Sequence, residues 1–481
     1  KYKNVKLLRY GKVMIMTDAD VDGTHIKALI LNVFHHLFPS LLLRKVPFVV
    51  SMQTPIVKIF QRGGDLTFYN EELFYRFIKE QETQGNNNFR IKYYKGLGTS
   101  SDAEVKDTFG KKVVEYTHDD QTPQTMDKIF HNKFSNERKK WLEAYNPVVM
   151  EDDGNVVSQM DITNFMDTDL IKYSLDDCGR SIPCLFDGLK QSQRKILYAT
   201  FLKNLSYSSK SMKVAQLCGF VAEKTNYHHG ENCLQTTITG MAQDFVGSNN
   251  IPLFFKDGQF GSRLHGGKDA ANGRYIFTKL NRMTRHLFPQ EDDVLLDNIL
   301  DDGDKVEPEY YLPILPTVLI NGCAAGIGTG WSCSIPCFNP LDVLAAVRTW
   351  IENGHILEET EEGTISNIEN LTPWYNQFTG KIHETEEGSG KYITEGNITP
   401  KGKSYVVDEL PVGLWTEKFK DNLEDLLESK KLKKMNNHCK PKTINFEIVP
   451  ADDLVVSIQS LKLTSTLNTS NMVLFVEKGK L

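Results

Sequence analysis

A short strand, an aspartate-rich loop and a helix follow one another near the start of the chain and constrain how this part can fold. The apolar run KVMIMT, Lys12–Thr17, has the composition of a short strand. The loop DADVDG follows it, and a helix is expected from Thr24 to about Phe38, where Pro39 ends it. Three aspartates therefore occupy alternate positions on a strand-to-helix loop.

The aspartates of this loop, Asp18, Asp20 and Asp22, predict a metal site. Carboxylates so close together repel one another unless a cation neutralises them, and hard oxygen ligands suit Mg²⁺. The run D-x-D-x-D-G also matches the opening of a calcium-binding EF-hand loop. That loop needs a preceding helix and a glutamate at its twelfth position, where this chain has Leu29. A carboxylate-capped turn is a further alternative, although it would not need all three side chains.

A second unusual stretch is GQFGSRLHGGKDAANGRY, Gly258–Tyr275. Its glycines let a backbone approach a ligand closely, and Arg263, Lys268 and Arg274 supply positive charge for phosphate. Tyr275 then opens an apolar run, IFTKL, that is compatible with a helix. Two interpretations remain open from these residues. Either a tyrosine nucleophile is presented to a phosphodiester with Arg274 beside it, or a loop holds a buried tyrosine.

The net charge of −6 does not by itself suggest nucleic acid, but the distribution of charge does. The stretch Lys190–Gln290 holds 14 Lys and Arg residues against 5 Asp and Glu, whereas Glu291–Tyr310 holds 9 Asp and Glu and one Lys. A basic patch inside an acidic protein concentrates a polyanion locally. A solvated basic face is an equal alternative.

A chain of 481 residues, of which 40% are hydrophobic and 25% charged, has the size and composition of about two to four globular domains. No apolar run reaches the length of a membrane span, and no signal peptide opens the chain. Eight cysteines are typical here of reduced thiols rather than of a disulfide framework. Cys333 with Cys337, or His438 with Cys439, could ligate a metal, but no second pair at zinc-site spacing supports this.

The segment GQFGSRLHGGKDAANGRYI closely resembles the active-site segment of type IIA DNA topoisomerases, in particular of the eukaryotic-type topoisomerase II branch. The resemblance implies that Tyr275 is the nucleophile that attacks a DNA phosphate and that Arg274 stabilises the transition state. It extends over most of the chain through several separate motifs. The activity it implies is Mg²⁺-dependent, reversible cleavage of double-stranded DNA through a 5′-phosphotyrosyl intermediate, which serves ATP-dependent strand passage in the full-length enzyme.

The DxDxDG loop resembles the metal site of the family's Toprim domain. The resemblance implies that Asp18, Asp20 and Asp22 bind Mg²⁺, or Mn²⁺ or Ca²⁺ in vitro, together with an upstream glutamate in an EGDSA-like motif. No such motif occurs in this sequence. We therefore expect a fragment that lacks this glutamate and the ATPase module that precedes Toprim in the family, so that ATP is bound by the full-length enzyme and not by this segment.

Two further motifs imply contacts with DNA. The segment YYKGLGTS is similar to the family's KGLGT segment, which makes Lys95 a phosphate contact. Lys133 lies in the charged, helical segment FHNKFSNERKKWLEAY and either touches the DNA backbone or is solvated on a helix surface. The segment IPCLFDGLKQSQRKILYATF resembles the family's IPSLxDGLKPGQRK, in which Lys190, Arg194 and Lys195 bracket the start of a helix suited to phosphate.

The sequence KVAQLCGFVAEKTNYHHGENCLQTTITGMAQDFV predicts two helices joined at about His228–Glu231, a helix-turn-helix pattern. The family places groups that face the broken strand at this turn, so the resemblance assigns Tyr227, His228 and His229 to DNA binding. Adjacent histidines are more often capping or packed than functional, and the resemblance favours a DNA contact for His229. Arg263 and Lys268 of the glycine-rich stretch are assigned to DNA binding as well.

The segment YLPILPTVLINGCAAGIGTGWSCSIPCFNP resembles the family's PIIPxxLxNGxxGIGTGxxxxIP segment. The resemblance implies that Ile327 is the wedge that enters a base step and bends DNA, at a cost of a few kcal/mol that wrapping contacts offset. The alternative is an ordinary core isoleucine. The run NGCAAGIG is one residue longer than the usual form and has alanine where the eukaryotic cellular pattern tends to have an acidic residue. Because of this departure, we also consider a viral source.

The resemblance implies a multidomain α/β and α+β protein. The segment VVDELPVGLWTEKFKDNLEDLLESKK is similar to the family's tower, and LTSTLNTSNMVLF resembles the strand before its coiled-coil arms. The EDDGN run in Pro147–Val157 indicates an exposed linker. We expect residues 1–150 to form the C-terminal part of a Rossmann-like Toprim domain and the linker, residues 151–335 a winged-helix domain with the catalytic tyrosine, and residues 336–481 an α+β tower or shoulder domain.

The expected partners are double-stranded DNA and a second copy of the chain, with each subunit of a homodimer cutting one strand, and no membrane. The expected location is the nucleus for a cellular protein, or the host cytoplasm and viral factory for a viral one. Two rival functions remain. A Toprim nuclease or primase explains the aspartates but gives Tyr275 and Ile327 no purpose, whereas an architectural DNA-binding protein explains the basic helices but leaves the aspartates idle.

Overall fold

The computed structural model describes residues 8–62, 64–85, 89–94, 96–146, 157–301, 303–360, 363–452 and 454–476. The chain divides into two compact units, which are described separately. Unit 1 comprises residues 1–178 with the short segment 328–331, and unit 2 comprises residues 179–327 and 332–481. Most of the predicted linker, residues 147–156, lies outside the described residues. The division into two units does not test the predicted three domains.

Unit 1 contains a mixed four-stranded sheet in the order β1-β2-β6-β7, in which β1–β2 and β6–β7 are parallel and β2–β6 is antiparallel. Its central strand β2 reads VVSM and is buried at all four positions, as expected for a strand covered on both faces. The strand β6 reads VVEYT and buries alternate residues. These strands are β1 (Val13–Ile15), β2 (Val49–Met52), β6 (Val113–Thr117) and β7 (Val157–Asp161).

The helix after β1 is α1, Val21–Leu37, which confirms the predicted strand, loop and helix. It begins three residues before the expected Thr24 because the Asp20 carboxylate accepts a hydrogen bond from the Gly23 amide at 2.6 Å and caps the first turn. A Cβ at Gly23 would lie 2.2 Å from the Asp18 carbonyl oxygen. The glycine of the DxDxDG motif is therefore required because the loop passes too close for any side chain.

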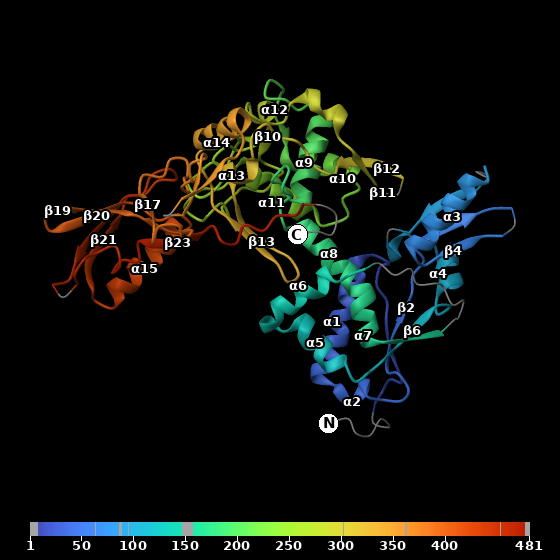
Figure 1. Ribbon diagram of the computed structural model, residues 1–481. Helices are drawn as coiled ribbons and strands as arrows, with labels where there is room; N and C mark the ends of the chain where they lie inside the picture. The colour runs from blue at the N-terminus through green and yellow to red at the C-terminus, as the bar shows by residue number, and fades with distance from the viewer. Residues whose placement is uncertain are drawn as a thin grey trace. The chain divides into compact units, whose positions relative to one another are not determined.

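A second, antiparallel sheet in unit 1 has the order β4-β3-β5 and packs against α3. Its small core is formed by Val57, Ile59 and Phe74, and Figure 1 shows α3 beside this sheet. The elements are β3 (Val57–Phe60), β4 (Leu66–Phe68), α3 (Glu71–Thr83) and β5 (Arg90–Tyr93). The other helices of this part of the chain are α2 (Pro39–Leu42), α4 (Asp102–Thr108), α5 (Thr122–Phe130), α6 (Ser135–Glu143), α7 (Ile162–Phe165) and α8 (Ile171–Ser181).

Unit 2 has its largest core where three helices meet a small antiparallel sheet of order β8-β10-β9 (Figure 1). The helices α10 and α11 confirm the predicted helix pair, with residues 225–230 between them. The core includes Ile196 of α9, Val221 of α10, Leu234 of α11 and Phe254 of β9, all nearly inaccessible to solvent. The elements are α9 (Gln191–Leu202), β8 (Met212–Lys213), α10 (Val214–Lys224), α11 (Glu231–Ala242), β9 (Phe254–Asp257) and β10 (Phe277–Leu280).

The run after Tyr275 was expected to be compatible with a helix, and this expectation is wrong. Residues Phe277–Leu280 form β10, which pairs with β9 and β8. Thr278 and Leu280 face the core while Phe277 and Lys279 are half-buried, the alternation of a strand. Pairing with two neighbouring strands decides the conformation, because so short an apolar run has no clear period of its own.

The rest of unit 2 is α+β in character. Two hairpins, β11–β12 and β13–β14, precede a region in which α15 packs on the four-stranded sheet β19-β20-β22-β21 through Phe419 and Phe446 (Figure 1). The strands are β11 (Asn298–Asp301), β12 (Asp304–Pro308), β13 (Cys323–Ile327), β14 (Ser332–Ile335), β15 (Leu357–Thr360), β16 (Gly363–Ser366), β17 (Lys381–Glu384), β18 (Lys391–Glu395), β19 (Asn397–Lys401), β20 (Ser404–Glu409), β21 (Leu432–Asn437), β22 (Phe446–Pro450) and β23 (Thr464–Asn468). The helices are α12 (Thr284–Leu287), α13 (Thr317–Asn321), α14 (Pro340–Asn353) and α15 (Thr416–Glu428). Among the described residues, no helix is both long and apolar enough to cross a membrane.

The last turn of α1 holds a histidine that makes the stability of unit 1 depend on pH. Burial lowers the pKa of His35, and the neighbouring His36 and His118 lower it further against the opposing effect of Asp127. The Nδ1 atom of His35 is buried without a hydrogen-bond partner among the described residues. The folded state therefore favours the neutral ring more than the unfolded chain does.

Because the unfolded chain takes up this proton first, the free energy of unfolding should fall as the pH drops below the ordinary histidine value of about 6.5. His35→Gln should lose less stability than the parent between about pH 8 and about pH 5. Denaturant titration at both pH values measures this, with the exposed His286→Gln in unit 2 as the control. Equal losses in the parent and in His35→Gln would show that His35 does not contribute.

Candidate active site and nucleic-acid interface

The glycine-rich stretch Gly258–Tyr275 forms the connection from β9 to β10. Its glycines serve packing within the protein rather than approach to a ligand. Gly261 has φ of +90°, and a Cβ there would lie 2.4 Å from the carbonyl oxygen of Gly267. A Cβ at Gly267 would lie 2.3 Å from the Gln243 side-chain nitrogen. The connection therefore closes tightly on itself and on α11.

Hydrogen bonds fix this closed conformation. The Asp269 carboxylate accepts from the backbone amide of Ser262 at 2.8 Å and from its hydroxyl at 2.6 Å. The Gln243 side chain donates to the carbonyl oxygens of Phe260 at 2.8 Å and Gly267 at 3.3 Å. Ser262 is buried and its hydroxyl is engaged in a hydrogen bond, so it is not an alternative to Tyr275 as the predicted nucleophile.

Arg263 was predicted to bind DNA, and the structure gives it a different role. It is 8% exposed, and its guanidinium lies 2.6 Å from Glu409 Oε1 and donates to the Leu410 carbonyl oxygen at 2.8 Å. The other carboxylate oxygen of Glu409 accepts from the backbone amide and the hydroxyl of Thr379, each at 3.0 Å. Arg263 thus joins the glycine-rich connection to the end of β20, and its charge is satisfied inside unit 2.

Tyr275 lies at the exposed end of this rigid connection. Its side chain is 70% exposed, whereas the next residue, Ile276, is 2% exposed and anchors the backbone in the core. The Tyr275 amide donates to the Asn272 carbonyl oxygen at 2.9 Å. The Arg274 guanidinium carbon lies 5.5 Å from the centre of the Tyr275 ring, and Arg274 Nε donates to Asn272 Oδ1 at 3.2 Å. The alternative of a buried tyrosine is therefore excluded.

Two of the three basic residues predicted at the start of α9 are also internal. Arg194 forms a bidentate pair with Asp187, at 2.6 and 3.1 Å, and both residues are buried. Lys195 Nζ donates to the Thr225 carbonyl oxygen at 2.7 Å and to Glu307 Oε2 at 2.8 Å. The predicted phosphate contacts of Arg194 and Lys195 are corrected to structural ion pairs, because a buried charge is retained only with a partner.

Lys190 remains at the surface, next to the hairpin that carries Ile327. Its Nζ donates to the carbonyl oxygen of Ala325 in β13 at 2.8 Å, and its backbone amide donates to the Gln193 side chain, which caps α9. Ile327 ends β13 opposite Ser332 and is 73% exposed. The alternative of a core isoleucine is excluded, and an exposed apolar side chain stands beside a cation.

The turn between α10 and α11 holds the predicted histidines. His228 and His229 are exposed, and the His229 ring lies edge-on to the Tyr227 ring with centroids 5.3 Å apart. The His229 Nε2 atom is 3.4 Å from the guanidinium of Arg180, a basic residue that the sequence analysis missed. Burial raises the pKa of Tyr227, so its hydroxyl stays protonated at neutral pH. Their predicted contacts with DNA stay predictions.

Two further predicted contacts, Lys268 of unit 2 and Lys133 of unit 1, are exposed on a loop and on a 3₁₀ turn, respectively. Lys95 lies outside the described residues. Neither exposed lysine has an ion-pair partner within the part of the chain that the structure describes, unlike Arg194, Lys195 or Arg263.

The three aspartates lie on the loop between β1 and α1 but do not converge on one point. Asp18 and Asp20 are exposed, and Asp22 is partly buried in the first turn of α1. The Asp18 Oδ1 atom accepts a hydrogen bond from the Leu97 amide at 2.6 Å, so Leu97 of the KGLGT segment contacts this loop. No group of three or more His, Cys, Asp or Glu residues in the described ranges is arranged to hold a metal. Asp18 and Asp20 therefore suit Mg²⁺ in chemistry but supply only part of a ligand set.

The comparisons with known proteins agree with these features. Residues 180–481 match the family model of the A-type subunit of DNA gyrase/topoisomerase IV, and residues 52–178 match that of the C-terminal domain associated with TOPRIM. The chain belongs to the type II DNA topoisomerase family. The matched segments cover unit 2 and most of unit 1. The type II topoisomerase family in general requires a divalent metal.

Individual type II topoisomerases are similar over the entire chain. The DNA topoisomerase 2 of Invertebrate iridescent virus 6 is 42% identical across 100% of this chain, and that of Arabidopsis thaliana is 41% identical across 100%. These matches cover 42% and 32% of the two relatives, so the chain spans well under half of their length. The crystal structure of the Plasmodium falciparum topoisomerase II DNA-binding, cleavage and re-ligation domain superimposes with a TM-score of 0.80, at 38% identity over 99% of this chain and 64% of that one.

The buried position of Arg263 leads to a stability prediction for this topoisomerase segment. Arg263→Ala should lower the free energy of unfolding by about 3–5 kcal/mol, because Glu409 would be left as an unpaired buried charge. Lys268→Ala, an exposed change in the same connection, should stay within about 0.5 kcal/mol of the parent. Denaturant unfolding of both variants measures the difference. Similar small effects for both would mean that Arg263 is a surface cation, as the sequence predicted.

Proposed function

We propose that this chain is the DNA cleavage and religation core of a type IIA topoisomerase, which breaks both strands of a duplex and rejoins them. The observation that carries the proposal is Tyr275, an exposed phenol beside Arg274 at the end of a connection that hydrogen bonds hold rigid. An exposed phenol held beside a guanidinium is placed where both groups can reach a phosphate, which supports a reactive role. The similarity to the cleavage domain of the Plasmodium enzyme supports it.

The proposed reaction is a reversible transesterification. The Tyr275 oxygen attacks a DNA phosphorus and loses its proton, while the bond from phosphorus to the 3′ oxygen of the neighbouring deoxyribose breaks and that oxygen gains a proton. One phosphodiester replaces another, so the bond energy is retained and the reverse reaction needs no cofactor. A base or water must accept the proton of the phenol as its oxygen attacks.

Arg274 is the residue we assign to the phosphoryl oxygens. Its guanidinium lies beside the Tyr275 ring, where a phosphate attached to the phenol oxygen can accept paired hydrogen bonds. Such a fixed cation stabilises the charge that gathers on these oxygens as the bonds rearrange. Asp18 and Asp20 would hold Mg²⁺, whose charge stabilises the leaving oxygen when it is bound.

We assign DNA binding to the residues of the predicted interface that remain at the surface. Lys190, Lys268 and Lys133 supply charge for phosphates, and Tyr227, His228 and His229 form the turn at the start of α11. Ile327 is the wedge between base pairs, which its exposure supports. Contacts between these lysines and DNA phosphates provide affinity without sequence preference.

The remaining parts of the proposal extend to the whole protein. Residues 1–150 would be the Toprim part, residues 151–335 the winged helix and residues 336–481 the tower. The full-length enzyme would work as a homodimer on double-stranded DNA and use ATP outside this segment for strand passage. It would act in the nucleus of a cell, or at the viral factory in the host cytoplasm if the source is viral, as the similarity to an iridescent-virus enzyme suggests.

Tyr275→Phe should abolish the covalent protein–DNA adduct and leave the fold and DNA affinity unchanged. The change removes one oxygen from a side chain that is 70% exposed, so the core loses no contact. Supercoiled plasmid with Mg²⁺, followed by detergent, separates the outcomes. Adducts with the parent and intact plasmid with the variant are expected, and mass spectrometry should find the nucleotide on Tyr275. Free nicks by both proteins would indicate a nuclease instead.

The aspartate loop needs a variant that spares the fold. Asp20→Ala would remove the cap of α1 as well as a carboxylate, whereas Asp20→Asn keeps the capping acceptor and removes only the charge. Asp20→Asn should reduce cleavage at a fixed Mg²⁺ concentration by at least roughly tenfold, since even outer-shell changes cost about 10- to 100-fold in metal affinity. A Mg²⁺ titration of adduct formation measures this.

DNA affinity and the melting temperature serve as controls for Asp20→Asn, and both should match the parent. Cleavage that matches the parent at every Mg²⁺ concentration would assign the aspartate a purely structural capping role.

A further inference from the structure

Two cysteines lie on the paired strands of the β13–β14 hairpin, whose end carries Ile327. Cys323 lies in β13 and Cys333 in β14, and they are 8% and 2% exposed. The pairing shifts register between Cys323 and Gly326, and Gly326 is paired with Cys333. A Cβ at Gly326 would lie 3.3 Å from the Cys333 Cβ. Since glycine leaves this space free, the irregular pairing places the two cysteines close enough for each to shift the pKa of the other.

This proximity makes the two thiols unequal. The neighbouring Cys333 lowers the pKa of Cys323, and Lys190 reinforces this effect against the opposing effect of burial. The neighbouring Cys323 and burial raise the pKa of Cys333. A thiolate is the nucleophilic form of cysteine. Cys323 is therefore arranged as an attacking thiol, and Cys333 as a protonated partner next to it.

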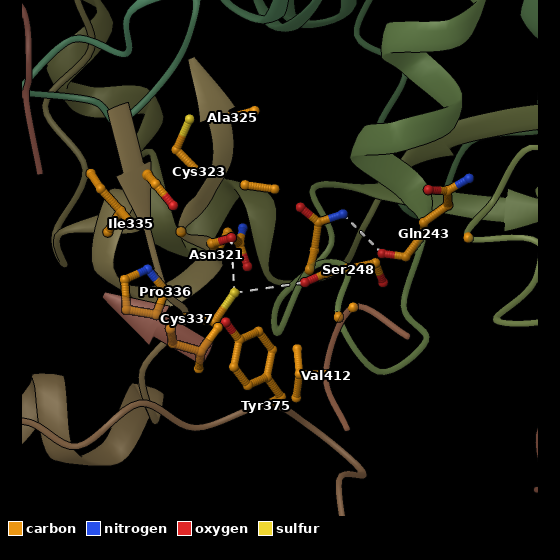
Figure 2. A pocket seen from close by; sticks show the side chains of 18 of the residues that line it. Gln243, Ser248, Asn321, Cys323, Ala325, Ile335, Pro336, Cys337, Tyr375 and Val412 are labelled. Atoms are coloured by element: carbon orange, nitrogen blue, oxygen red, sulfur yellow. Dashed lines mark hydrogen bonds between the residues drawn. The ribbon is translucent and has the colours of Figure 1, made fainter. Parts of the chain in front are cut away.

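A cavity gives access to Cys323. It lies within unit 2, has a volume of about 1030 Å³, and is lined by Cys323 and Cys337 but not by Cys333 (Figure 2). Three lysines, Lys190, Lys418 and Lys462, also line it. A small molecule that carries carboxylates would enter such a positively charged cavity more readily than a neutral one.

Cys337 lines the same cavity in a different state. Its thiol donates to the carbonyl oxygen of Asn321 at 3.0 Å, and the carbonyl oxygen of Ser248 lies 3.7 Å from its sulfur (Figure 2). Burial raises the pKa of Cys337 to about 12. Cys323 and Cys337 thus line one cavity, but their pKa values are shifted in opposite directions, so Cys337 is an internal control for the reactivity of Cys323.

We propose that Cys323 and Cys333 are a redox-active dithiol, oxidised to a disulfide by a small carboxylate-bearing disulfide of the glutathione type, and that this cross-link restrains the hairpin of Ile327. The Cys323 thiolate attacks one sulfur of the small disulfide, whose S–S bond breaks and releases one thiolate, which takes up a proton. Cys333 then loses its proton and attacks the Cys323 sulfur, and the second small thiol leaves. Two cysteine thiols are oxidised and one small disulfide is reduced to two thiols.

The cross-link has a mechanical consequence that rests on the proposed role of Ile327. A disulfide holds two Cβ atoms about 3.5–4.5 Å apart and permits few dihedral angles. It would join the two strands on the core side of Ile327 and fix the irregular pairing between them. Oxidation should then change how far the wedge opens a base step, and with it the bend of bound DNA.

The chemistry is tested on the whole protein without DNA. The protein is incubated with oxidised glutathione at neutral pH, quenched with acid, alkylated after unfolding, and digested without reduction for mass spectrometry. We expect a peptide pair linked through Cys323 and Cys333, with Cys323 reacting at least about tenfold faster than Cys337, because each pKa unit changes the thiolate fraction tenfold. Cys233, which is exposed, is the reference for an ordinary accessible thiol.

Two variants separate the roles of the thiols. Cys333→Ser should retain glutathione on Cys323 as a mixed disulfide, and Cys323→Ser should leave Cys333 unreacted. A Cys323 that is still a thiol when Cys233 has fully reacted, or one that reacts no faster than Cys337, would overturn the proposal. These readouts need no DNA and stand apart from the proposed function.

The effect of the disulfide on DNA bending is tested by fluorescence energy transfer between labels at the two ends of a short DNA duplex. The bend angle should differ between the oxidised and reduced parent and should be unaffected by oxidant in Cys333→Ser. Ile327→Ala provides the comparison. If Ile327→Ala changes the bend but oxidation does not, the control of the hairpin by the dithiol is refuted. If neither changes it, the proposed wedge role of Ile327 is refuted instead.

Discussion

The presentation of Tyr275 depends on a buried ion pair between Arg263 and Glu409. Both side chains are nearly inaccessible to solvent, and each makes further hydrogen bonds to neighbouring backbone groups or to Thr379. Removing two charges from water is costly unless their geometry and their remaining hydrogen bonds are good, and here both are. The pair joins the middle of the connection Gly258–Tyr275 to the end of β20. If the connection moved away from β20, Glu409 would lose the cation that balances its buried charge.

The same connection is held by Asp269 and Gln243, so the exposed end that bears Tyr275 and Arg274 has little freedom to move. A nucleophile held in one orientation does not lose that freedom again when a substrate binds. In the proposed reaction, this rigidity would contribute through residues other than the nucleophile itself. It also explains why a stretch with so many glycines is ordered: several of them allow close backbone packing and not flexibility.

The local order of elements can be predicted from the sequence, whereas the partners of charged residues cannot. The strand, aspartate loop and helix at 12–38 and the helix pair at 214–242 are recognisable because hydrophobic pattern and capping residues are local signals. The prediction for the run Phe277–Leu280 is wrong because its conformation is set by pairing with β9. The contact between Asp18 and Leu97, 79 residues apart, has no local signal either.

Basic residues show this limit most clearly. Arg194, Lys195 and Arg263 belong to motifs that resemble a DNA-binding surface, yet each is neutralised inside unit 2. Asp187 is close to Arg194 in the sequence, but Glu307 lies 112 residues from Lys195. No sequence feature near Arg263 indicates that Glu409 is its partner. A count of positive charge along the chain therefore overstates the charge available to a polyanion. Only the tertiary structure distinguishes basic residues that are neutralised inside the protein from those that remain available at its surface.

The exposure of Ile327 bears on how this protein can change over generations. An isoleucine that is 73% exposed buries little apolar surface in the free protein, so folding alone gives it almost no advantage over a polar residue. Mutational drift filtered only by the ability to fold would let this position vary and would keep Arg194, because Asp187 stays buried opposite it. If descendants keep isoleucine at this position, the selection must come from binding to another molecule. If they keep Arg194, selection for folding alone is a sufficient explanation.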